Sequence, residues 1–201
     1  MISALLVSLS FNFDNIVIGI AYGIKKIKIG FQANLIIALV TASGTFLSMA
    51  AGQYIAGFLP SGAANVAGAV GMAGFGLYFI LQSLRPGKKG KETKELALKD
   101  VPDMMEYAEQ SDRNHNGSIG VKEAALVGLS LMGNNLGTGI AASITHISAF
   151  VTAAATFGIS LFTLALGNFL GKHAAGKLAG KYAALISGMI LILLGILEYS
   201  R

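Results

Sequence analysis

The sequence of 201 residues contains no cysteine, and only 12% of its residues are charged. Without cysteine, neither a disulfide bond nor a thiolate metal site can form. A soluble domain carries about 25% charged residues. Two stretches, residues 29–84 and 124–171, contain no Asp, Glu, Lys or Arg. Each is long enough for two spans of about 20 residues, so the sequence indicates an integral membrane protein.

Apolar segments predict an all-α chain with six transmembrane helices. The first segment lacks a basic region and a small-residue cleavage site, so we expect it to be a retained span. A hydrophilic segment, residues 87–123, separates one three-span half, residues 1–86, from another, residues 124–201. The expected spans are residues 2–24, 31–59, 65–84 and 124–144, a fifth ending near Gly171, and residues 182–197.

Basic residues indicate the orientation of these spans. Fourteen of the 15 Lys and Arg lie in the three loops that six spans place on one side. The positive-inside rule makes that side cytoplasmic and puts both termini outside. The membrane topology thus explains the net charge of +5. We expect a lipid bilayer as a partner and no nucleic acid. Three spans per half is an odd number, which predicts two inverted three-helix repeats.

A short stretch of the first span recurs in the fourth. Residues 9–21 match residues 129–141 at a constant offset of 120, so that Asp14 and Asn15 correspond to Asn134 and Asn135. The second and fifth spans agree more loosely, with Gln53 matching Asn168. A polar cluster repeated in both halves is typical of transporters with internal symmetry.

Asp14 is the only acidic residue within any expected span, and no span contains Lys or Arg. A carboxylate at membrane depth costs about 2.5 kcal/mol or more on insertion, so it usually marks a functional site. One interpretation is that Asp14 is a cation ligand or a proton carrier. The other is that its side chain is protonated and only forms hydrogen bonds between helices. The expected site adds the amides of Asn12, Asn15, Asn134 and Asn135, with Ser10, Ser130, Gln53 and Asn168 around them.

Hard divalent cations take oxygen ligands of these kinds. The absence of cysteine, and of any histidine at this depth, argues against a site selective for zinc or copper.

A second candidate site lies in the hydrophilic segment. Residues 112–123 fit the EF-hand loop pattern at every defined position, with Gly117 at the sharp turn and Ile119 at the usual apolar position. The alternative is an Asn- and Gly-rich turn that matches by chance. Two carboxylates are few for such a loop, which predicts weak binding of Ca²⁺ or Mn²⁺. The expected ligands are Asp112, Asn114, Asn116, Ser118 and Glu123.

The motifs of the first and fourth spans resemble the bacterial manganese efflux pump family of the lysine-exporter superfamily. The EF-hand-like loop followed by Asn134 and Asn135 is most similar to its sporulation membrane protein branch. This resemblance implies six spans in two repeats and export of Mn²⁺. The family's pumps carry an acidic residue at both repeat positions, whereas the second position here is Asn134.

We therefore expect a multi-pass protein of the bacterial plasma membrane that exports a divalent cation, with Mn²⁺ as the expected ion. Its loop is expected to sense Ca²⁺ or Mn²⁺. One alternative is a metal-binding membrane protein that does not transport. The other is an exporter of a small organic cation or amino acid. No nucleophile–base pair, HExxH spacing or Walker loop occurs in the sequence, which argues against an enzyme.

Overall fold

The computed structural model describes residues 1–84, 101–173, 189–197 and 199. These residues are mostly helical, which confirms the all-α prediction. Residues 189–197, within the expected sixth span, are also helical. The helices are α1 (Ile2–Phe11), α2 (Phe13–Ile24), α3 (Phe31–Ala56), α4 (Ser61–Leu84), α5 (Val101–Ser111), α6 (Val121–Ile144) and α7 (Ala149–His173), and the strands are β1 (Lys28–Ile29) and β2 (Ser118–Ile119).

Three helical segments are long and apolar enough to cross a membrane, namely Ile2–Ile24, Phe31–Ala56 and Ala149–His173. Many of their large apolar side chains are exposed, for example those of Leu47, Phe150 and Phe162. Many Ser, Thr and Asn side chains are buried instead. An apolar surface over a partly polar interior suits a bilayer and not water.

The first expected span is not one continuous helix. It breaks at Asn12, where α1 ends and α2 begins. The backbone N–H of Asn12 donates to the carbonyl of Leu9 at 3.1 Å, which tightens the last turn of α1. Breaks of this kind are tolerated at membrane depth only where the freed backbone groups find partners inside the protein.

The turn between α6 and α7 forms without glycine or proline, as expected for residues 145–148. His146 has a φ of +64°, in the left-handed region that His visits more often than most residues. Its N–H donates to the carbonyl of Ser143. This single residue lets α6 and α7 run in opposite directions.

Glycines bring two pairs of helices into close contact. A Cβ on Gly167 of α7 would lie 2.3 Å from the carbonyl oxygen of Ile16, and one on Gly19 of α2 would lie 2.6 Å from that of Leu164. In the second pair, a Cβ on Gly52 of α3 would lie 2.4 Å from the carbonyl oxygen of Ile140. The α2–α7 and α3–α6 contacts are the most extensive in the fold, because small residues let backbones approach closely in lipid.

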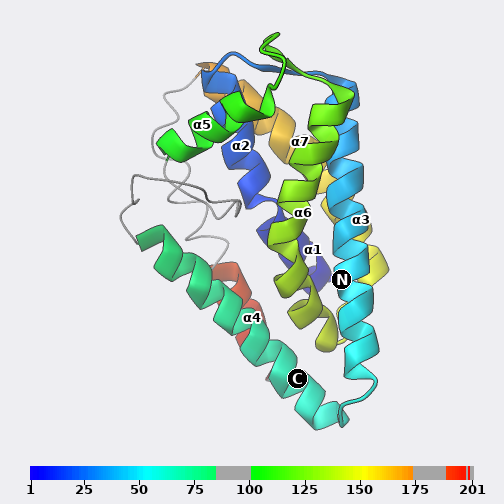
Figure 1. Cartoon of the computed structure of the whole chain (residues 1–201). Coiled ribbons are helices and arrows are strands. Elements are labelled where there is room, and N and C mark those ends of the chain that lie inside the picture. The colour runs from blue at the N-terminus through cyan, green and yellow to red at the C-terminus, as the bar shows by residue number, and fades with distance from the viewer. Residues whose placement is uncertain (85–100, 174–188, 198, 200–201) are drawn as a thin grey trace.

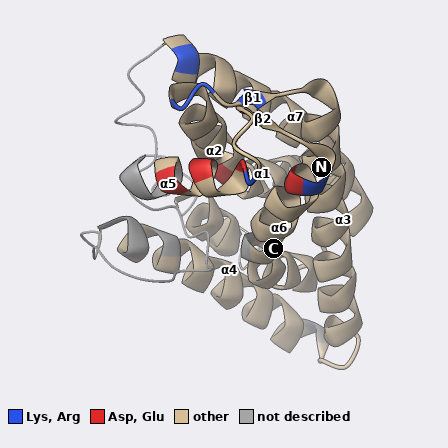
Figure 2. Cartoon of the chain, turned by 45° about the horizontal axis from the view of Figure 1, so that its top comes forward, with Lys and Arg blue, Asp and Glu red and all other residues tan. Residues whose placement is uncertain are grey.

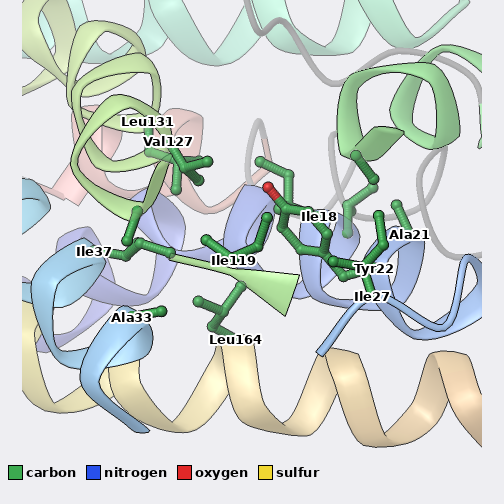
Figure 3. Packing of buried hydrophobic residues seen from close by; sticks show 13 residues of the cluster. Ile18, Ala21, Tyr22, Ile27, Ala33, Ile37, Ile119, Val127, Leu131 and Leu164 are labelled. Carbon is green, nitrogen blue, oxygen red and sulfur yellow. The ribbon is translucent and has the colours of Figure 1, made fainter. Parts of the chain in front are cut away.

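The short strands close one end of this bundle. Lys28 pairs with Ser118 and Ile29 with Ile119 in a parallel ladder. Ile119 is buried and points into an apolar cluster that α2, α3, α5, α6 and α7 share (Figure 3). Apart from Asp14 on α2, the charged residues of the described part of the chain gather at this same end, around α5 and the strands (Figure 2). The helix α4 packs on α6 and extends away from that end (Figure 1).

The contact of α2 with α7 predicts a specific sensitivity. Gly167→Ala should lower the free energy of unfolding by about 1–3 kcal/mol, because the added methyl would overlap the Ile16 carbonyl. The matched control is Gly158→Ala on the same helix, where a Cβ meets nothing within 4 Å and alanine favours the helix. Thermal unfolding in detergent measures both, and an equal Tm for the two variants would contradict the close approach.

Candidate functional site: the break in the first span

The break between α1 and α2 is built from asparagine side chains. Asn12 donates through Nδ2 to the carbonyl of Ser8 at 2.7 Å and accepts at Oδ1 from Nδ2 of Asn15, also at 2.7 Å. The same Nδ2 of Asn15 donates to Oγ of Ser160 on α7 at 2.8 Å. These bonds tie both halves of the broken span to one another and to α7.

Asp14 lies in the first turn of α2, next to this amide pair, and its side chain is 6% exposed. Its Oδ1 accepts the backbone N–H of Asn15 at 3.1 Å. The N-terminus of a helix carries partial positive charge, which stabilises a carboxylate there. The break therefore places the carboxylate at a half-helix N-terminus within the bundle, an arrangement that a continuous helix would not provide.

The fourth-span segment contributes to the same place. Asn135 of α6 is buried and donates through Nδ2 to the carbonyl oxygen of Phe11 at 3.4 Å, at the end of α1. The side chain of Asn134 lies outside the described residues. Three of the expected amides, those of Asn12, Asn15 and Asn135, thus meet at the break.

The four residues expected around the site divide into two groups. Ser10 is buried on the last turn of α1 and Ser130 is half-buried on α6. Gln53 is exposed and bonds the carbonyl of Ile147 at one end of the bundle, whereas Asn168 bonds the carbonyl of Ile27 at the other end. The two paired amides of the second and fifth spans therefore hold loops in place and do not reach Asp14.

Sequence reasoning missed two residues next to the site. Ser160 of α7 accepts the bond from Asn15, and its Oγ lies 3.5 Å from Oγ1 of Thr41 on α3. A signal was present in the sequence, because hydroxyl residues recur at helical spacing along both uncharged segments. Single Ser and Thr residues are common in spans, and only the packing of α2, α3 and α7 shows which ones meet.

The expected metal loop is a compact turn between α5 and α6. Asp112 is buried, and its carboxylate accepts the N–H groups of Asn116 at 3.2 Å and Gly117 at 2.8 Å. Gly117 has a φ of +74°, a conformation that glycine adopts without strain. Glu123 is also buried and accepts the N–H groups of Gly120 at 2.7 Å and Arg113 at 2.9 Å.

The loop's amide side chains turn toward its own backbone. Oδ1 of Asn114 accepts the N–H of Asn116 at 3.1 Å, and Oδ1 of Asn116 accepts the N–H and the hydroxyl of Ser118, both at 2.8 Å. Among the described residues, no three His, Cys, Asp or Glu side chains come together as they would around a metal ion. The loop's oxygens thus share one small turn but are bonded to N–H and O–H groups.

The helix α5 connects this loop to the break. Tyr107 packs against the apolar cluster that contains Ile119. Burial raises the pKa of the Tyr107 phenol. Hydrogen bonds with the side chains of Ser130 and Ser111 lower this pKa, and the negative charge of Asp14 raises it. On the surface, Lys25 at the end of α2 pairs with Glu109. The loop, α5 and the broken span therefore form one continuous set of contacts.

The chain is similar to the probable sporulation protein YtaF of Bacillus subtilis (strain 168). The two are 29% identical over 211 residues, and the match covers 98% of each chain. No protein-family model matches the sequence, and no solved structure matches it. Because the similarity extends over the full length, it concerns the spans and the loop together.

Proposed function

We propose that this chain exports a divalent cation across the bacterial plasma membrane through a site at the break in the first span. The proposed ion is Mn²⁺. The observation that carries the proposal is a buried carboxylate, Asp14, at the N-terminus of a half-helix and beside an amide cluster. Discontinuous helices form the substrate sites of many transporters, because their freed backbone groups and helix ends can contact ions.

The oxygen chemistry of the break agrees with a hard cation. Asp14 supplies negative charge, and the amides of Asn12 and Asn15 supply neutral oxygens beside it. A carboxylate at membrane depth is costly and usually marks a functional site, and the expected spans contain no Lys or Arg. A transported cation would balance the negative charge of Asp14. Export would draw on an ion gradient, since no motif for coupling to ATP occurs.

Six spans in two inverted repeats would account for the helix contacts. The first span packs against the fifth through α2 and α7, and the second packs against the fourth through α3 and α6. Exchanging the two halves converts each pair into the other. Paired glycines take part, since Gly52 at the α3–α6 contact and Gly167 at the α2–α7 contact occupy matching positions. The helical residues 189–197 would belong to the sixth span.

The distribution of charge supports a cytoplasmic location for one end. The charged residues of the loops gather near α5 and the strands (Figure 2), as the positive-inside rule expects for the cytoplasmic side. Both termini would then lie outside. The loop of residues 112–123 would lie in the cytoplasm, where it could respond to Ca²⁺ or Mn²⁺ before either ion reaches the break.

One structural feature favours the alternative of a membrane protein that does not transport. Asn15 and Asn135 already bond neighbouring helices, and such bonds alone can hold a bundle together. The carboxylate of Asp14 separates the two proposals, because helix pairing does not require a negative charge. An exporter of a small organic cation or amino acid would also use that charge, and transport assays with those substrates distinguish it.

Asp14→Asn should abolish export while the protein stays folded. The substitution removes the charge and keeps the shape, and the loss of an ionic partner lowers cation binding by roughly a hundredfold. Mn²⁺ efflux from loaded cells measures the effect, with Glu109→Gln, which removes an exposed charge on α5, as the control. Equal efflux by the native protein and the Asp14 variant would make Asp14 a structural residue.

The topology follows from the same proposal. A reporter fused after Arg201 should be active only outside the cytoplasm, and one inserted at Lys94 should be active only inside. Six spans and an extracytoplasmic N-terminus require this combination. Activity of both reporters on the same side would exclude the inverted repeat, and the reverse pattern would exclude the proposed orientation.

Calcium binding by the loop can be measured separately. In Glu123→Gln, the bidentate carboxylate is lost, so calorimetric titration of the purified protein with Ca²⁺ should show a strong decrease in affinity relative to the native chain. Lys122→Gln, at the neighbouring exposed position, should bind as the native protein does. Absence of any heat in the native protein would exclude an EF-hand-like site.

A further inference from the structure

A column of hydroxyl and amide side chains runs through the protein between α3, α7 and the broken first span. All of its members are buried, although both helices face lipid on their other sides. The column consists of Thr41, Thr45 and Ser48 on α3, of Thr152, Thr156, Ser160 and Thr163 on α7, and of Ser8, Asn12 and Asn15 on the first span.

Most hydroxyls of the column are satisfied by their own helix. Thr41 donates to the carbonyl of Ile37 at 2.9 Å, and Thr163 donates to that of Ile159 at 2.8 Å. Hydroxyls in spans commonly bond to the preceding turn in this way.

Three oxygens of the column differ. Oγ1 of Thr45, Oγ1 of Thr156 and Oδ1 of Asn15 are buried and have no hydrogen-bond partner among the described residues. The side chains of Thr45 and Thr156 are both 0% exposed. An unpaired buried polar atom costs about 1–3 kcal/mol, so a fold that carries three of them in one column requires an explanation.

Helix direction places two of these oxygens opposite each other. Gln53 contacts Ile147, and Thr41 contacts Ser160, so α3 and α7 are antiparallel. One turn from the Thr41–Ser160 contact, toward Gln53, the next residues on the same faces are Thr45 and Thr156. The third oxygen, on Asn15, belongs to a side chain that already contacts Ser160.

The internal repeat gives the same placement independently. The two helices match at a constant offset of 115 residues, so that Thr41 corresponds to Thr156 and Thr45 to Ser160. Exchanging the halves therefore converts the observed Thr41–Ser160 contact into a contact between Thr156 and Thr45. The two unpaired hydroxyls lie where the symmetry of the column expects a pair.

The two halves differ at one bond, and this difference leaves Thr45 unpaired. Asn15 of the first half donates to Ser160 of the second half. Exchanging the halves converts this bond into one from Asn135 to Thr45, but Asn135 donates to the carbonyl oxygen of Phe11 instead. Among the described residues, Thr45 and Thr156 thus keep hydroxyl oxygens that no hydrogen bond uses.

We propose that Thr45, Thr156 and Asn15 hold a monovalent cation of the Na⁺ class, which couples its own movement to export. Hydroxyl and amide oxygens are neutral, so they can replace the water around a single charge, whereas divalent cations are usually bound with carboxylates. A proton does not suit this column, because none of these side chains titrates in the physiological range.

This inference rests on the proposed function, because it names the coupling ion of the same site. Asn15 joins the two parts, since it contributes to the column and directly follows Asp14 in the same turn of α2. A monovalent ion beside Asn15 would repel a divalent ion at Asp14. Such repulsion makes the binding of one ion oppose the binding of the other, as an antiporter requires.

Sodium binding can be tested without any transport. The Tm of the purified native protein should be about 3 °C higher in NaCl than in choline chloride of equal ionic strength, if sodium is about tenfold above its Kd. Thr45→Val and Thr156→Val should lose this shift. In choline, both variants should be at least as stable as the native protein, because they remove an unpaired hydroxyl.

The matched control is Thr163→Val, at the end of the same column, where the hydroxyl bonds its own helix. It should keep the sodium-dependent shift. An equal Tm in sodium and choline for the native protein would overturn the proposal, and so would a shift that survives in both Thr45→Val and Thr156→Val.

Transport separates this inference from the proposed function. In liposomes, Mn²⁺ efflux should depend on an opposing Na⁺ gradient, and Thr156→Val should lower that dependence at least tenfold. Mn²⁺ efflux that does not depend on the Na⁺ gradient would overturn the coupling of export to sodium and leave the proposed function intact. Sodium stabilisation without Mn²⁺ movement would keep the cation site and refute manganese export.

Discussion

The structure depends on the break at Asn12, because a broken span leaves backbone groups that lipid cannot satisfy. Each of the helices around the break supplies a partner or a close contact. Asn135 of α6 donates to the carbonyl of Phe11, Ser160 of α7 accepts from Asn15, and the glycines of α2 and α7 bring the backbones together. The bundle thus encloses the break, and the enclosed break positions Asp14.

Polarity is distributed opposite to that of a soluble protein, and this distribution links the fold to its chemistry. Large apolar residues of α3 and α7 face outward, while hydroxyl and amide groups line the contact between these helices and the first span. In a bilayer, apolar contact between helices adds little drive for association, so glycines and polar bonds hold the helices. The ion sites proposed above would use these same polar groups, so packing and ion binding would depend on one set of side chains.

The loop of residues 112–123 is integrated into the bundle and does not extend away from it. Its Ile119 lies in the cluster shared by five helices (Figure 3), and its β2 strand pairs with β1 in the connection between α2 and α3. Tyr107 of α5 hydrogen-bonds with Ser130 of α6, and the negative charge of Asp14 acts on the Tyr107 phenol by raising its pKa. Any ion that reorganised the loop's carboxylates would therefore act on elements that bear the break. Because the loop hydrogen bonds use the same oxygens as a metal would, the two arrangements would compete.

The sequence by itself determined the helical class, the approximate bounds of the long helices and the positions of the polar residues. Those features are local, since apolar length and turn-forming residues can be recognised within one segment. The helix α6 also ends within the expected turn, in which His146 has a positive φ. The repeat of residues 9–21 at 129–141 also pointed to the polar cluster around Asp14 from both halves.

Only the tertiary structure decided that the first span breaks at Asn12, that Asn135 reaches Phe11, and that Gln53 and Asn168 lie at opposite ends of the bundle. It also decided which hydroxyls meet, leaving Thr45 and Thr156 unpaired while Thr41 is satisfied. The physical reason is that each choice depends on which faces of distant helices touch. That outcome depends on close glycine contacts and on competition among buried donors and acceptors, neither of which is a property of a single segment.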